Sequence, residues 1–121
     1  MYNSSKPIHN IILDRKVRIK MSDGEEIAAV LVRPSSRGKF PGIVEYTPYR
    51  RLNFVQDLVS EKDYNHRWHG PAWFAQRGYA VIIFDVRGTG NSSGFSKDIY
   101  SERERTDAYE VVDWIANQPW C

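Results

Sequence analysis

The first residue that could do chemistry is a serine flanked by glycines. Residues 90–94 fit the pattern G-x-S-x-G, which in serine hydrolases presents the nucleophile on a sharp turn directly between a strand and a helix. Here residues 87–89 separate the motif from the preceding apolar run, and no apolar helical stripe follows it. Every histidine of the chain also precedes Ser92, whereas the histidine of such a triad follows its serine. We therefore interpret Ser92 as part of a structural turn.

The same stretch has features of a phosphate-binding loop. Gly88 and Gly90 fit the start of the fingerprint G-x-G-x-x-G, whose glycines bring the backbone close to a dinucleotide where a helix begins. The third glycine, Gly94, stands one place late, and no helical pattern opens at the motif. A nucleotide-binding α/β domain is therefore kept as an alternative, which saturable binding of a dinucleotide would support.

A metal or redox site lacks the necessary cluster of ligands. His66 and His69, with Asp63 nearby, lie in an irregular stretch that offers no further firm ligand. Cys121 is the only cysteine, so neither an internal disulfide nor a cysteine metal cluster is possible. We expect no metal and no cofactor.

The composition is typical of a globular domain. The 121 residues are 41% hydrophobic and 26% charged, and the formal net charge is +2. Basic and acidic residues are interspersed, which indicates no face for nucleic acid or a membrane surface. No apolar run approaches the roughly 20 residues that span a bilayer, and no signal peptide is recognised. We expect a cytoplasmic protein without nucleic-acid or membrane partners.

Hydrophobic periodicity predicts the elements around these motifs. Alternating apolar residues at 17–21 and 27–32, joined by a turn at 22–24, predict an antiparallel hairpin. A polar lead-in over residues 1–16 precedes the hairpin. The nearly continuous apolar run at 79–84 predicts a strand that is buried on both faces. The remaining predicted elements are a strand at 42–46 and helices at 71–76 and 102–118.

This order of elements predicts an α/β fold. The strand–helix–strand unit gives parallel pairing with a right-handed connection, so an antiparallel hairpin leads into a mixed, mostly parallel sheet. The apolar strand at 80–84 needs neighbours on both edges, and the alternating pattern calls for another strand after the last helix. We therefore interpret the chain as truncated after Cys121.

Five segments, in order, carry a resemblance to a known family. These segments are residues 21–24, 47–50, 77–81, 85–94 and 113–121. Through them the chain resembles the cocaine esterase and X-prolyl dipeptidyl-peptidase-like serine hydrolases, which implies the N-terminal part of an α/β-hydrolase domain over residues 17–121. In that family the nucleophile elbow, the acid and the histidine come later, so the resemblance implies that this chain lacks the triad and is inactive alone.

One functional residue can be carried over from the family. The resemblance implies that Tyr49, in the proline–tyrosine pair after the third strand, helps to form the oxyanion hole. The chemistry is sensible, because oxyanion donors in this fold come partly from the loop after the third strand. A phenol is also a good neutral donor to a developing alkoxide. The alternative is a buried aromatic residue whose hydroxyl is satisfied.

Two charged residues follow the buried strand. Asp85 and Arg87 stand at its carboxyl end, where open α/β sheets place ligands. We expect them to hold the following loop by a mutual ion pair rather than to take part in catalysis.

The resemblance implies a small-molecule ester or a peptide as substrate. Arg50 and Arg51 would disfavour a cationic acyl group if they point into the site. Whether the enzyme is an esterase, an amidase or an X-prolyl peptidase depends on residues beyond this chain. A third interpretation is a non-catalytic protein that associates through an exposed sheet edge, which a stop codon after Cys121 would favour.

Overall fold

The computed structural model describes residues 5–49 and 70–121. The interpretations of Arg50, Arg51, His66 and His69 fall outside the described residues. The described elements are β1 (Ile11–Lys20), β2 (Glu26–Pro34), β3 (Gly42–Thr47), α2 (Pro71–Ala75), β4 (Ala80–Asp85) and α3 (Glu102–Ala116).

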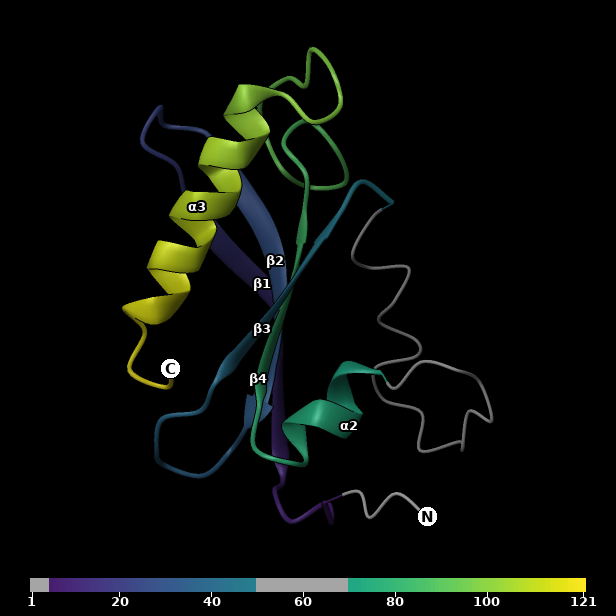
Figure 1. The fold of residues 1–121 in the computed structure, drawn as a ribbon, viewed down its shortest axis with the longest axis vertical. Coiled ribbons are helices and arrows are strands. Elements are labelled where there is room, and N and C mark those ends of the chain that lie inside the picture. Colours follow the sequence, from purple (N-terminus) through teal and green to yellow (C-terminus); the bar gives the residue numbers. More distant parts are fainter. Residues whose placement is uncertain (1–4, 50–69) are drawn as a thin grey trace.

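Within the described residues, the strands form one mixed sheet in the order β1-β2-β4-β3 (Figure 1). β1 and β2 form an antiparallel hairpin, β2 is antiparallel to β4, and β3 runs parallel to β4. The register of the parallel pair runs from Gly42 opposite Ala80 to Thr47 opposite Asp85. The predicted α/β mixed sheet is confirmed, and among the described strands two of the three pairings are antiparallel and one is parallel. Its parallel pair brings the carboxyl ends of β3 and β4 side by side.

Two helices cover opposite faces of this sheet (Figure 1). On one face, Phe84 of β4 belongs to the same apolar cluster as Val111 of α3. On the other face, Ile83 packs in a cluster with Ala75 of α2. Every residue of β4 is buried, as expected for a central strand covered on both sides. β4 is therefore the buried central strand from which the loop leading to α3 starts.

The first strand is longer than the alternation of apolar residues predicts. β1 begins at Ile11 rather than at Val17, so part of the expected lead-in pairs with β2. The register shifts between Asp14 and Val17, as at a β-bulge, which inserts an extra residue and interrupts the pleat. Ile11 packs on the α2 side, whereas Val17 packs on the α3 side. The polar residues 14–16 interrupt the alternation of apolar side chains at this bulge, so the pattern in the sequence marks only the second part of the strand.

Both predicted helices form, and both end earlier than expected. α2 starts at Pro71, which suits a first helical position, and Gly78 leaves the turn with φ +92°. α3 starts after Ser101, whose side chain accepts a hydrogen bond from the Glu104 N–H. It ends at Ala116 rather than at residue 118, because Asn117 has left the helical region at φ −91° and ψ 0°.

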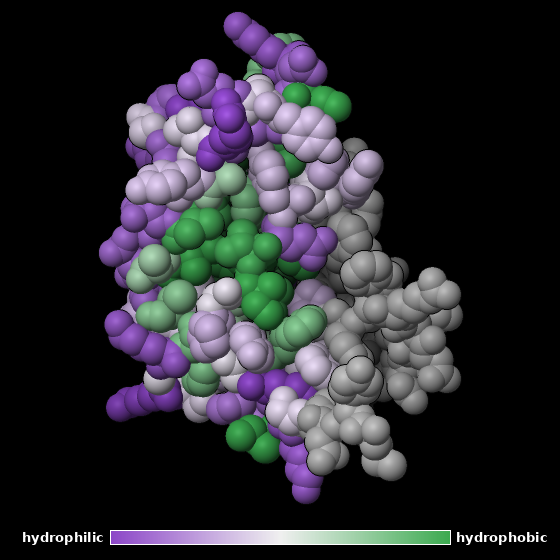
Figure 2. All heavy atoms as spheres, in the orientation of Figure 1, coloured by the Kyte–Doolittle hydropathy of each residue, from purple (hydrophilic) through white to green (hydrophobic). Residues whose placement is uncertain are grey.

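One face of the molecule shows apolar side chains gathered over β3, beside α3 (Figure 2). Val44 of β3 is 37% exposed and Val112 of α3 is 51% exposed. β3 lies at an edge of the sheet in the described part of the chain, which explains why its apolar side chains are less buried than those of β4.

Candidate functional site

The loop after β4 is organised around a buried carboxylate. Asp85, the last residue of β4, is fully buried, and its Oδ2 accepts a hydrogen bond from the Asn91 N–H at 3.1 Å. Gly90 has φ +51°, and a Cβ at this position would fall directly on the Asp85 carboxyl group. The glycine is therefore required by close packing as well as by its backbone conformation.

Ser92 extends the sheet instead of serving as a nucleophile. It is 8% exposed. Its Oγ donates to the Asp85 carbonyl at 2.7 Å and accepts from the Ala28 N–H at 2.9 Å. Both capacities of the hydroxyl are thus used to bridge β4 and β2 where their ladder ends. No helix follows the motif before α3, and the predicted structural turn is confirmed.

Several backbone N–H groups of this loop already have partners, which weakens the physical basis for phosphate binding. The N–H groups of Gly88, Thr89 and Ser92 donate to carbonyl oxygens within the loop at 2.9–3.0 Å. The Ser93 N–H donates to the carbonyl of Glu26. A phosphate cradle needs such N–H groups to point at the ligand.

Arg87 does not pair with Asp85, contrary to the expectation from sequence. Its Nε and Nη2 donate to the two carboxylate oxygens of Asp107 at 2.7 and 2.8 Å. Its Nη1 lies 2.9 Å from Oδ2 of Asp23. Asp85 is only two places away in sequence, but Asp107 on α3 and Asp23 in the hairpin turn are the carboxylates that the fold places around the guanidinium. Arg87 therefore ties three separate segments together.

Further charged groups extend this network along α3. Nη2 of Arg103 lies 2.9 Å from Asp107 and 3.4 Å from Glu110. The pKa of Asp23 lies below its ordinary value, chiefly because its carboxylate accepts a hydrogen bond from Arg87. Asp107 and Asp23 in turn raise the pKa of Arg87, which stays charged. The arrangement connects the hairpin turn, the loop after β4 and α3.

Tyr46, at the end of β3, has a buried hydroxyl. Within the described part of the chain this oxygen has no hydrogen-bond partner. Burial, with the nearby charges of Glu104 and Asp107, raises the pKa of Tyr46. Its phenol therefore stays neutral, and it lies under α3 among the apolar side chains, unlike Tyr49.

Tyr49 lies just beyond the end of β3, next to the end of β4. Its side chain is 74% exposed, which contradicts the alternative of a buried core aromatic. Its N–H donates to the Oγ1 of Thr47 at 3.1 Å. Thr47 is buried and stands opposite Asp85 in the sheet. The predicted oxyanion donor is thus attached to the carboxyl end of the sheet, where α/β folds bind their ligands.

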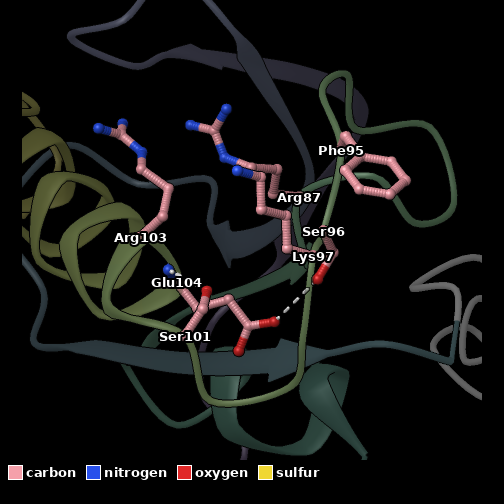
Figure 3. A pocket seen from close by; sticks show the side chains of 7 residues that line it. All are labelled: Arg87, Phe95, Ser96, Lys97, Ser101, Arg103 and Glu104. Carbon is pink, nitrogen blue, oxygen red and sulfur yellow. Dashed lines mark hydrogen bonds between the residues drawn. The ribbon is translucent and has the colours of Figure 1, made fainter.

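A pocket of about 250 Å³ lies between the loop after β4 and the start of α3 (Figure 3). The pocket was not predicted from the sequence, because its walls form only when the loop after β4 packs against the start of α3. Glu104 in its wall is already used: it accepts hydrogen bonds from the Tyr100 N–H at 2.8 Å and from Ser96 Oγ at 3.4 Å. Arg87 and Arg103, also in the wall, are engaged with Asp107.

The described residues contain no group of three or more histidine, cysteine, aspartate or glutamate side chains placed to hold a metal ion. A search of the same residues found no helix long and apolar enough to cross a membrane.

The family comparison points to one group of enzymes. Residues 23–121 match the family described as X-Pro dipeptidyl-peptidase (S15 family). A Mycobacterium tuberculosis (strain CDC 1551 / Oshkosh) protein named as a serine esterase is 34% identical in an alignment of 119 residues that covers 85% of this chain. Cocaine esterase from Rhodococcus sp. (strain MB1 Bresler) is 30% identical over 112 residues, 93% of this chain. The chain spans 18% of the length of each relative.

Solved structures show the same fold. A CocE/NonD family hydrolase from Staphylococcus aureus superposes with a TM-score of 0.75 at 26% identity, over 91% of this chain and 21% of that one. An α-amino acid ester hydrolase superposes with a TM-score of 0.63 at 22% identity, over 98% of this chain and 20% of that one. The second likeness concerns the fold alone.

Proposed function

Because the chain belongs to the X-Pro dipeptidyl-peptidase (S15) family, we propose that it serves the hydrolysis of an ester or amide through an acyl-serine intermediate. The substrate class that fits this chemistry is a small-molecule ester or a peptide. Ser92 is committed to bridging β2 and β4, and every histidine precedes it. We therefore assign no triad member to this sequence and look to charge stabilisation for its part in catalysis.

Tyr49 is the residue that we assign to this part. Attack of a serine on a carbonyl creates a negatively charged oxygen, and preorganised hydrogen-bond donors aimed at that oxygen lower the barrier. In α/β-hydrolases one donor comes from the loop after the third strand, and Tyr49 stands in that loop, two places after the end of β3. Its phenol donates without adding a charge.

The position of Tyr49 is the observation that carries the proposal. The carboxyl ends of β3 and β4 are held side by side by the register that sets Thr47 opposite Asp85. Ligands of open α/β sheets bind outside such ends. A 74% exposed aromatic ring at this place is not needed to fill the core.

The test is the variant Tyr49→Phe in the whole enzyme, assayed with an activated ester. Losing one oxyanion donor lowers kcat by roughly 10²–10³. KM should change much less, because the donor acts mainly in the transition state. Tyr109→Phe is the matched control, since Tyr109 on α3 is also 74% exposed; its kcat should equal that of the wild type. An unchanged kcat for Tyr49→Phe, with a lower melting temperature, would contradict the proposal.

The other interpretations have less support. A nucleotide-binding role would need free N–H groups in the loop after β4, and those of Gly88, Thr89 and Ser92 are bonded within the loop. An association module would use a sheet edge such as β3, which is an edge strand among the described residues, but family membership favours the enzyme.

The proposal of a cytoplasmic location rests on the composition and on the free thiol of Cys121.

A further inference from the structure

A short connection carries the chain from the buried end of β3 to the exposed ring of Tyr49. Thr47 is 3% exposed, and its Oγ1 accepts the hydrogen bond from the Tyr49 N–H at 3.1 Å. Pro48 between them has a fixed φ and no N–H, and it restricts Thr47 to an extended conformation. The Thr47 hydroxyl and the Pro48 ring therefore set the direction in which the Tyr49 side chain leaves the sheet.

Thr47 is itself anchored to the most buried strand. Its carbonyl accepts from the Val86 N–H at 3.0 Å, directly after the pair that it forms with Asp85. The Val86 carbonyl accepts from Thr89 twice, from the N–H at 2.9 Å and from Oγ1 at 2.6 Å. A continuous chain of hydrogen bonds thus runs from the loop after β4 through Thr47 to the backbone of Tyr49.

From this geometry we propose that Thr47 is a positioning residue for Tyr49. The inference rests on the proposed role of Tyr49 as oxyanion donor and names the group that holds the donor in place. An oxyanion donor contributes only when it is held at the right distance from the developing charge, and a displacement of about 1 Å can reduce turnover by roughly 10²-fold. The hydrogen bond from the Tyr49 N–H to the buried Thr47 is a contact that can resist such a displacement.

The deciding experiment is a double-mutant cycle in the whole enzyme with an activated ester. Thr47→Val keeps the branched shape and removes the acceptor, whereas Thr47→Ser keeps the acceptor and removes the methyl group. We expect kcat to fall by roughly 3- to 30-fold in Thr47→Val, with little change in KM, and to stay near wild type in Thr47→Ser. In the Tyr49→Phe background, Thr47→Val should cause no further fall, because no phenol remains to be positioned.

The outcomes separate this inference from the proposed function. A Tyr49→Phe enzyme with wild-type kcat would overturn both. A reduced kcat in Tyr49→Phe, together with the same loss from Thr47→Val in both backgrounds, would overturn only the positioning role and make Thr47 a stability residue. Equal losses in Thr47→Val and Thr47→Ser would also overturn it, since the methyl group would then be the important part.

Amide hydrogen exchange tests the same contact without an activity assay and covers the case in which Thr47→Val folds poorly. Pro48 has no amide, so the first exchanging amide after Thr47 is that of Tyr49. This amide should exchange faster in Thr47→Val and in Thr47→Ala than in wild type, and at the wild-type rate in Thr47→Ser. Equal exchange rates in all variants would show that the hydroxyl does not hold Tyr49 and would overturn the proposal.

Discussion

Arg87 and Asp107 form a two-point ion pair across the space between the loop after β4 and α3. Nε and Nη2 of the arginine lie 2.7 and 2.8 Å from the two carboxylate oxygens, and the two side chains are 7% and 0% exposed. Such planar, two-point contacts are the geometry that a guanidinium provides and an ammonium does not. The pair fixes the start of the loop against the helix.

Breaking this pair from one side should be costly. Asp107→Ala leaves the Arg87 guanidinium buried with the partly exposed Asp23 as its one remaining counter-charge among the described residues. Loss of one partner of a buried pair typically destabilises a protein by about 3–5 kcal/mol. Urea unfolding of Asp107→Ala and of Arg87→Lys should show a large loss for the first and a smaller but clear loss for the second. A loss within about 0.5 kcal/mol for Asp107→Ala, the size of an ordinary surface change, would contradict the structural role of the pair.

The lowered pKa of Asp23 predicts how stability depends on pH. A carboxylate whose pKa is lower in the folded state than its ordinary value of 3.8 contributes stability above that value. The contribution is lost as the pH falls from there through the folded pKa. Asp23→Asn should therefore be less stable than wild type near neutral pH, and the difference should shrink below about pH 4.

Unfolding free energies of both proteins between pH 2 and 7 measure this difference. The control is Asp98→Asn, because Asp98 is an exposed aspartate in the loop before α3 and lies outside the Arg87 network. The difference in unfolding free energy between Asp98→Asn and wild type should not follow the pH dependence expected for Asp23→Asn. A constant difference between wild type and Asp23→Asn at all pH values would contradict the ion-pair explanation.

Ser92→Ala should lower stability and leave chemistry unchanged. The substitution leaves the buried Ala28 N–H and the Asp85 carbonyl without their common partner. Leaving a buried polar group unsatisfied costs about 1–3 kcal/mol. In the whole enzyme, kcat per folded molecule should stay near wild type, because Ser92 is no nucleophile. Ser36→Ala, at an exposed loop position, is the control for stability. Abolished turnover by a fully folded Ser92→Ala enzyme would restore the nucleophile interpretation.

Gly90→Ala and Gly24→Ala separate backbone strain from steric clash. Both glycines have positive φ, at +51° and +90°, and an alanine in such a conformation costs about 1–2 kcal/mol. At Gly24 nothing lies within 4 Å of the added Cβ, whereas at Gly90 it meets the buried Asp85 carboxyl. Gly90→Ala should therefore be the more destabilising variant in thermal unfolding, by more than the strain alone. Equal losses would show that Asp85 can move aside.

Local patterns in the sequence determined the order of the elements and the residues at which both helices start. The apolar run at 79–84 identified the buried strand β4, and Pro71 and Gly78 marked the start of α2 and the turn that follows it. The separation of Ser92 from the preceding strand and the following helix excluded it as a nucleophile. These features depend on neighbours within one turn or one pleat, which are visible in the chain itself. The same holds for parallel pairing of β3 and β4, which follows from the helix between them.

Only the tertiary structure decided which distant groups meet. Asp85 is two places from Arg87, but the guanidinium binds Asp107, twenty places away, because α3 packs back against the loop. The bulge in β1 likewise depends on pairing with β2, because it lets Ile11 and Val17 pack on opposite faces of the sheet. The pocket between the loop and α3 exists only once they are packed. Such contacts depend on the free energy of the whole assembly of elements, and no short stretch of sequence contains it.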